Sequence, residues 1–227
     1  MKSQLQRASL AVASLLLVFG VTTAQAAIGT VVGSKHDFST TGPVAYRGAS
    51  TQTCIYCHAP HNTTSTTLLW NRAANAVTYT LYNAAISSTM DATVGQPGAV
   101  SKLCLSCHDG TVAIDSFGGA TGSKMATGSA NLGGTALSND HPIGFPYNDA
   151  LVTKDPGLRA VSTGVTIGTG NTGTIENKML FGATGAATVE CASCHDVHNS
   201  ATGTAVEAKL LKITTVSSAL CTTCHIK

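Results

Sequence analysis

The longest apolar stretch of the chain lies near its N-terminus, at residues 8–21. Lys2 and Arg7 precede this stretch, and Ala24-Gln25-Ala26 follows it. A basic start, a short apolar run and a small-x-small tripeptide are typical of a cleaved secretory signal peptide. The run is too short for a membrane-spanning helix, which needs ~20 apolar residues. We therefore expect residues 1–26 to be a signal peptide, with the mature chain exported and not stably inserted in a membrane.

Beyond residue 26, the apolar runs are short, and Gly, Ala, Ser and Thr dominate between them. Runs such as Val161 to Ile167 have β-forming composition and predict a hairpin or two without a continuous sheet. Helices are expected as short turns, with the segment from Ala205 to Ile213 the longest of them. The pattern predicts a mostly irregular fold with short helices and a few short strands.

The composition leaves little material for an ordinary core, because only 5% of residues are aromatic. Charged residues make up 11%, and the 13 Lys and Arg nearly balance the 11 Asp and Glu. No clustering of basic residues indicates a nucleic-acid interface. Some other group must therefore supply buried apolar mass.

All eight cysteines belong to four copies of the pattern C-x-x-C-H. This pattern is the attachment signature of c-type haem. The two thiols add to the two vinyl groups of one porphyrin, and the adjacent His is aimed at the iron. We number the expected haems 1 to 4 in chain order. Their motifs are Cys54, Cys57 and His58; Cys104, Cys107 and His108; Cys191, Cys194 and His195; and Cys221, Cys224 and His225.

Three other uses of paired cysteines explain the pattern less well. Structural zinc does not require a His after every second Cys. Thioredoxin-like redox chemistry uses one C-x-x-C in a βαβ setting. Disulfides suit an exported protein but leave the four histidines unexplained. Four covalent haems account for every cysteine and for the missing core mass, and we expect the apo chain to be largely unfolded.

Four histidines lie outside the motifs, at positions 36, 61, 141 and 198. Their number equals the number of haems, so His36, His61, His141 and His198 are the candidate second axial ligands. Each iron would then be six-coordinate and low-spin, with a lower reduction potential than His/Met ligation gives. Met90, Met125 and Met179 are the alternative ligands, but no marked sequence context surrounds them.

Two of these histidines follow a motif at a fixed offset. His61 comes three residues after His58, and His198 comes three residues after His195. If the turn is helical, the two Cβ atoms of each pair are ~5–6 Å apart. The second His then lies on the same side of the porphyrin as the first and must ligate a different iron.

The motifs also form two similar pairs, in which the first and third carry the extension C-x-x-C-H-x-x-H-N. The second and fourth follow Leu103 and Leu220, and a double Leu (Leu68–Leu69 and Leu210–Leu211) lies within each pair. We interpret residues 27–227 as one tetrahaem domain with two-haem units at about 36–118 and 185–227, joined by a Gly/Thr-rich segment. We expect His61 to ligate haem 2 and His198 to ligate haem 4. His36 and His141 are then left for haems 1 and 3.

His36 lies close to the start of the mature chain, where chains are usually loose unless tied down. As an iron ligand it would either anchor this arm on its own protein or reach a neighbour. A heterologous contact that does not close builds an open helical filament.

Three stretches resemble extracellular multihaem cytochromes, and most closely the tetrahaem cytochromes that polymerise into conductive surface filaments. They are Gly33-Ser34-Lys35-His36-Asp37, the segment from Cys54 to Asn62, and His141-Pro142-Ile143-Gly144. The resemblance implies four bis-His haems in a continuous stack and an N-terminal His that completes a haem of the adjacent subunit. By position His36 would have that role, on haem 3, with His141 on haem 1.

The expected function is electron transfer through the haems of a secreted subunit, assembled head to tail into an extracellular conductive filament. Redox-partner cytochromes and extracellular electron acceptors are the expected partners. The alternative is a monomeric periplasmic tetrahaem shuttle. A multihaem reductase is disfavoured, because such an enzyme needs an open iron position and the distal histidines suffice for every iron.

Overall fold

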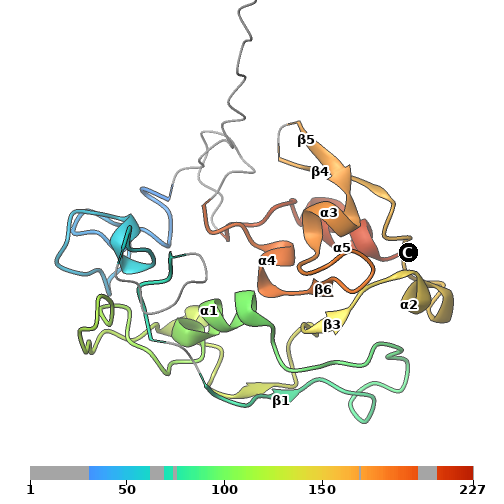
Figure 1. The fold of residues 1–227 in the computed structure, drawn as a ribbon, viewed down its shortest axis with the longest axis horizontal. Helices are drawn as coiled ribbons and strands as arrows, with labels where there is room; N and C mark the ends of the chain where they lie inside the picture. Colours follow the sequence, from blue (N-terminus) through green and yellow to red (C-terminus); the bar gives the residue numbers. More distant parts are fainter. Residues whose placement is uncertain (1–30, 62–68, 74–75, 169, 199–208, 227) are drawn as a thin grey trace, which may run out of the picture.

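The computed structural model describes residues 31–61, 69–73, 76–168, 170–198 and 209–226. In these residues the chain consists mainly of turns, bends and loops, and its helices and strands are short (Figure 1). The predicted mostly irregular fold is confirmed at this level. The expected signal peptide lies outside the described residues. Within the described ranges, no helix combines the length and apolar character that crossing a bilayer requires.

Each C-x-x-C-H motif begins or lies within a short helix, as the sequence predicted. Motif 1 forms the 3-10 helix η1, and motif 2 ends α1, the longest helix in the described part of the chain. Motif 3 forms α4 and motif 4 ends α5. The bounds of the four helices are Cys54–Tyr56 (η1), Ala99–His108 (α1), Cys191–Cys194 (α4) and Ala219–Cys224 (α5).

The other helices contain no motif. Asn148 caps α2 (Asp149–Lys154) by accepting a hydrogen bond from the Leu151 amide. Thr174 begins α3 (Ile175–Met179) with a reciprocal capping box. Two 3-10 turns complete the set, η3 (Gly128–Ala130) and η5 (Val216–Ser218).

The strands form three separate two-stranded sheets rather than one continuous sheet. β4 (Gly164–Ile167) and β5 (Asn171–Thr174) form an antiparallel hairpin, which confirms the strand prediction for this region. β3 (Phe145–Pro146) pairs with β6 (Thr188–Val189) in antiparallel fashion. β1 (Thr80–Leu81) and β2 (Ala136–Leu137) are parallel.

The helix predicted from Ala205 to Ile213 is not found in the part of that segment that the structure describes. Residues 209–213 form a turn, a bridge and bends, and residues 205–208 lie outside the described ranges. Leu210 has a positive φ of 54°, which interrupts a right-handed helix. The next residue, Leu211, forms a β-bridge with His195. Backbone pairing with the third motif therefore replaces the local helix preference.

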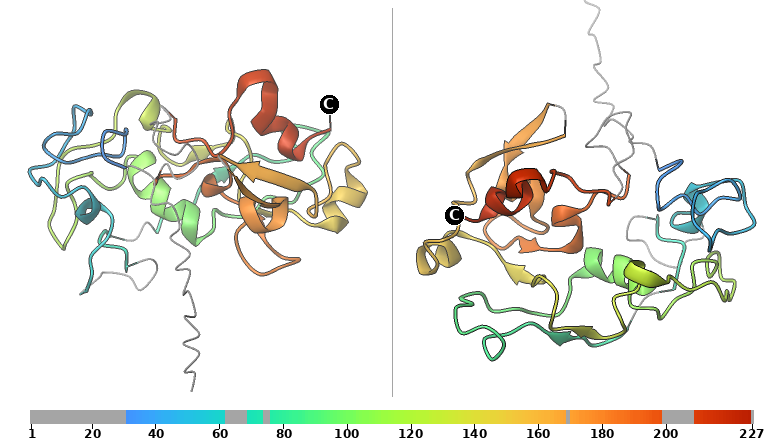
Figure 2. Two further views of the ribbon diagram at one scale, coloured as in Figure 1. Left: turned by 90° about the horizontal axis from the view of Figure 1, so that it is seen from above. Right: turned by 180° about the vertical axis from the view of Figure 1, so that it is seen from behind.

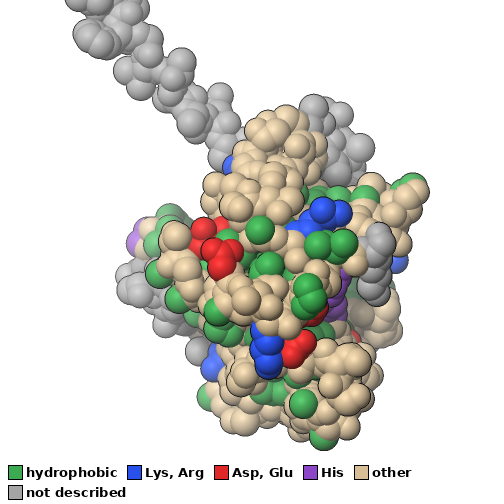
Figure 3. Space-filling model, turned by 90° about the vertical axis from the view of Figure 1, so that its right-hand side faces the viewer, with side chains coloured by type: hydrophobic (Ala, Val, Ile, Leu, Met, Phe, Trp, Pro, Cys, Tyr) green, Lys and Arg blue, Asp and Glu red, His purple; other side chains and the backbone are tan. Residues whose placement is uncertain are grey.

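The buried apolar residues of the described chain fall into three clusters. The largest surrounds Ile175 and Met179 in the C-terminal half, where Ile175 is fully buried. A second surrounds Tyr56, and a third contains only Tyr79, Leu105 and Leu137. Figures 1 and 2 show α1 between the N-terminal region and the C-terminal half. Charged side chains form small separate patches on the face drawn in Figure 3.

The largest cluster generates a stability prediction. Ile175→Ala should lower the free energy of unfolding by about 2–5 kcal/mol, because it removes a fully buried side chain and leaves a cavity. Ile86 is 50% exposed, so the same substitution there should cost roughly 0.5 kcal/mol or less. Denaturant titration of the two variants measures the difference. Equal losses in both would contradict the assignment of Ile175 to the core.

Candidate functional site

The four motifs adjoin one another in chain order. Burial raises the pKa of the Cys57 thiol to about 11, and nearby Cys107 of the second motif adds to this increase. The thiols of Cys104 and Cys191 hydrogen-bond to each other, which raises the pKa of Cys104 and lowers that of Cys191.

The third and fourth motifs are neighbours in the same way. Burial raises the pKa of the Cys224 thiol to about 11, and Cys194 adds to this increase. Thiols of motifs 1 and 2, 2 and 3, and 3 and 4 therefore lie close enough to influence each other's ionisation.

Three of the motif histidines are held by the same backbone arrangement. Each forms an isolated antiparallel bridge with a residue far along the chain: His58 with Trp70, His195 with Leu211, and His225 with Leu158. Hydrogen bonds flank each bridge on both sides. At motif 3, the Asp196 amide donates to Leu210 and the Lys212 amide donates to Cys194.

Equivalent bonds occur at motifs 1 and 4, from Ala59 to Leu69, Asn71 to Cys57, Ile226 to Gly157 and Arg159 to Cys224. The backbone direction is thus fixed on both sides of each histidine. Leu69 and Leu210 share a left-handed φ, of 53° and 54°. The double-Leu comparison must therefore be shifted by one residue, because the backbone equates Leu69 with Leu210 rather than with Leu211.

The second motif is held differently. α1 runs through His108, and the Leu132 amide donates a 2.7 Å hydrogen bond to the His108 carbonyl. The Nδ1 atom of His108 lies 2.7 Å from the Ala130 carbonyl oxygen. Both contacts come from the loop that contains η3, so this loop replaces the β-bridge of the other motifs.

In three histidines, a hydrogen bond at Nδ1 determines which ring nitrogen is free to bind a metal ion. The Nδ1 atoms of His108, His195 and His141 contact the carbonyl oxygens of Ala130, Lys209 and Pro142 at 2.7–2.9 Å. A carbonyl only accepts, so Nδ1 carries the proton. Nε2 then keeps its lone pair, which is the arrangement of a metal-ligating His fixed by a second hydrogen bond.

Three ring pairs each join one motif histidine to one of the four other histidines. The ring centres of His36 and His108 are 5.9 Å apart, those of His58 and His198 are 6.1 Å apart, and those of His141 and His225 are 6.5 Å apart.

These distances fit rings on opposite sides of one iron. An imidazole nitrogen lies about 2 Å from a bound first-row metal ion, so two such rings have centres roughly 6 Å apart. Ordinary ring contacts also cover this range, so the distance alone is not decisive. What distinguishes these three pairs is that each joins one motif histidine to one histidine outside the motifs. The residues therefore fit a haem iron at motifs 1, 2 and 4.

The ring pairs join different histidines from those that we expected. The structure places His36 beside the histidine of motif 2, His198 beside that of motif 1 and His141 beside that of motif 4, whereas we expected haems 3, 4 and 1. The assumed helical turn is absent at motif 3, where His195 has extended dihedrals of −105° and 145° and lies in a β-bridge with Leu211. His198 faces a histidine of another motif, and the spacing within one motif gives no information on which motif that is.

His61 and His195 remain outside the ring pairs of the described residues. The His61 side chain is exposed, as is that of His195. Met179, one of the alternative ligands, is 2% exposed and belongs to the largest apolar cluster. One distal histidine, His61, and one motif histidine, His195, thus have no histidine ring partner within the described part of the single chain.

The buried position of His36 favours its neutral form. Burial, together with the neighbouring His108, His195 and His198, lowers the pKa of His36 to about 4. Neutral imidazole is the form that binds metal ions. The same interactions indicate that histidines of the second and third motifs and the nearby His198 gather around His36.

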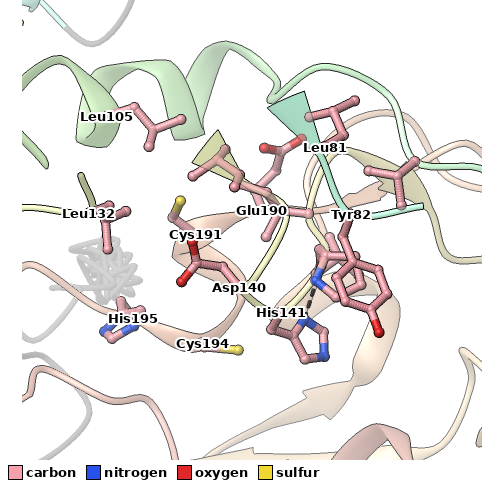
Figure 4. Close-up of a pocket in the computed structure, with 15 residues that line it drawn as sticks. Leu81, Tyr82, Leu105, Leu132, Asp140, His141, Glu190, Cys191, Cys194 and His195 are labelled. Carbon is pink, nitrogen blue, oxygen red and sulfur yellow. Dashed lines mark hydrogen bonds between the residues drawn. The ribbon is translucent and has the colours of Figure 1, made fainter. Parts of the chain in front are cut away.

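A cavity of about 200 Å³ lies at the third motif (Figure 4). Cys191, Cys194 and His195 line one part of it, and leucines such as Leu105 and Leu132 line another. His141 and Asp140 also border it. Pockets for drug-sized ligands enclose about 300–1,000 Å³, so a porphyrin here would extend beyond the cavity. A porphyrin attached through the thiols of Cys191 and Cys194 would need an apolar wall beside it, and the leucines of this cavity provide one.

Several buried polar residues at the motifs were not anticipated. Glu190, directly before Cys191, accepts hydrogen bonds from the Gly98 amide and from the hydroxyls of Ser101 and Thr188. Ser101 in turn accepts from the Cys191 amide at 2.9 Å. These bonds join α1 to α4 and so join the second motif to the third. Only the position of Glu190 beside a cysteine could have indicated its role.

The chain matches no protein-family model and no curated protein.

The junction between α1 and α4 generates a second prediction. Ser101→Ala should lower the free energy of unfolding by about 1–3 kcal/mol, because the buried Glu190 carboxylate and the Cys191 amide both lose a partner. Ser88 is exposed, and Ser88→Ala serves as the matched control with little expected effect. Thermal unfolding of both variants measures the cost. A Ser101 variant as stable as the Ser88 variant would contradict the structural importance of this junction.

Proposed function

We propose that the chain is an exported tetrahaem c-type cytochrome that transfers electrons through a row of bis-His haems. The thiols of each motif would attach one haem, and His58, His108, His195 and His225 would be the proximal ligands. When bound, the four haems would supply irons that exchange single electrons between the ferric and ferrous states. The observation that carries this proposal is the set of three ring pairs, each with one motif histidine and one other histidine.

The order of the motifs in space supports a conduit rather than separate sites. Neighbouring thiols connect motif 1 to 2, 2 to 3 and 3 to 4. The chain would hold successive haems side by side through the bonds around Ser101 and Glu190 and the β-bridges at the motif histidines. Two axial histidines leave no iron position for a substrate, which favours electron transfer over catalysis.

We further propose that the protein polymerises head to tail through His61, rather than through His36 as the sequence suggested. His36 already contacts His108 of its own chain. The histidine that follows motif 3, His198, contacts the motif 1 histidine, His58. By the same offset, His61 after motif 1 would serve His195 of motif 3 in another copy. Such a contact is heterologous, and repetition without closure gives an extracellular filament.

The haem content is tested on the protein matured in cells that have a c-type cytochrome assembly system. Mass spectrometry should find four covalent haems, and replacing Cys104 and Cys107 together by Ala should leave three. Exchanging Ser87 and Ser88 for Ala should leave four. A wild-type protein purified without haem would refute the proposed function.

The assembly is tested with two histidine variants. His61→Ala should remain monomeric with one high-spin haem, because no second ring reaches haem 3. His36→Ala should still polymerise, with high-spin character confined to haem 2. Electron microscopy and electron paramagnetic resonance measure the two properties.

A wild-type monomer with four low-spin haems would refute the filament and leave the periplasmic shuttle. A wild-type monomer with one high-spin haem would instead favour a reductase with an open position at haem 3, because His195 has no ring partner among the described residues.

A further inference from the structure

Arg72 is a buried cation that connects the first two motifs. Its side chain is 2% exposed. The guanidinium donates to the carbonyl oxygen of Tyr56, inside motif 1, at 3.0 Å. It also donates to the carbonyl oxygens of Ala113 and Ile114, shortly after motif 2. A planar guanidinium with several donors in fixed positions holds these backbones at one relative position.

The charge of Arg72 also lies close to the cysteines of both motifs. Burial raises the pKa of the Cys107 thiol, whereas the nearby Arg72 charge and a hydrogen bond from Arg72 act in the opposite direction. At Cys57 the Arg72 charge likewise opposes the effect of burial on the thiol pKa. Guanidinium stays protonated throughout the ordinary pH range, so this cation is permanent.

The second motif is also surrounded by carboxylates. Asp109 follows His108, is buried, and accepts hydrogen bonds from the Tyr79 hydroxyl and from Thr111. Asp37 follows His36, is buried, and accepts from Gly33, Ser39 and Thr53. The two aspartates thus each follow one histidine of the ring pair at motif 2.

Glu190 is the third carboxylate near this motif, across the junction of α1 and α4. All three of its hydrogen-bond partners, Gly98, Ser101 and Thr188, donate to it, which suits an ionised carboxylate. The Glu190 charge also acts on the Cys191 thiol, so this carboxylate lies between motifs 2 and 3, as Arg72 lies between motifs 1 and 2.

We propose that Arg72 is a positioning residue that fixes haem 1 against haem 2, and that its buried charge raises the potentials of these two haems, whereas the Glu190 carboxylate lowers those of haems 2 and 3. The inference rests on the proposed haem attachment. A buried cation disfavours the more positive ferric state and raises a reduction potential, whereas a buried carboxylate lowers it. Low dielectric around these groups leaves the effect poorly screened.

The test uses the haem-loaded protein and spectroelectrochemical titration. Arg72→Gln should shift at least one of the four components downward by tenfold in its ferrous-to-ferric ratio, which is about 59 mV for one electron. Arg72→Lys keeps the charge and should retain most of that potential. Glu190→Gln is nearly isosteric and should shift at least one component upward. The two charge-removing variants thus move the potentials in opposite directions.

Several results would overturn the proposal. Arg72→Gln with four haems and unchanged potentials would refute the electrostatic role. If Arg72→Gln and Glu190→Gln shift the potentials in the same direction, general loosening of the haem sites explains the result instead. If Arg72→Gln does not fold, Glu190→Gln decides alone, and four potentials that are all unchanged or lower in that variant contradict the proposal. Mass spectrometry keeps the outcomes separate, because loss of all haem from the wild type would refute the proposed function itself.

Discussion

Backbone hydrogen bonds on both sides of a motif histidine are the constraint on which the rest of this structure depends. At His58, His195 and His225 they pair the histidine with Trp70, Leu211 and Leu158. These bonds fix the backbone direction at the three histidines, and two of them, His58 and His225, face the ring of another histidine. At these three motifs the rigidity comes from single bridges rather than from long helices or a sheet, so little regular structure is sufficient there.

Buried polar side chains join the motifs where the apolar clusters are small. The clusters around Tyr56 and Tyr79 have fewer buried residues than the one around Ile175. Arg72 and Glu190 each connect two motifs through several hydrogen bonds to backbone and hydroxyl groups. Removing one partner of such a network leaves a buried polar group unsatisfied. The same residues that join the motifs therefore also fix the charge around them.

The sequence was sufficient for features that depend on local chemistry. The C-x-x-C-H spacing located four short helices, and β-forming residues near Val165 located the hairpin. It was insufficient for partners chosen across long stretches of chain. The pairing of His198 with His58 joins positions about 140 residues apart, and spacing within a motif gives no information on such a partner. The same limitation applies to the helix expected near Leu211, where pairing with His195 prevailed over local preference. Arg72 carries no sequence signal at all, because its partners are carbonyl oxygens that every residue possesses.

The contact between His58 and His198 also has a consequence for the order of events during synthesis. The two smaller apolar clusters draw only on residues 38–137, so a chain synthesised from its N-terminus can complete them early. The ring that faces His58 is synthesised about 140 residues later. The first motif to be synthesised is therefore among the last to be completed.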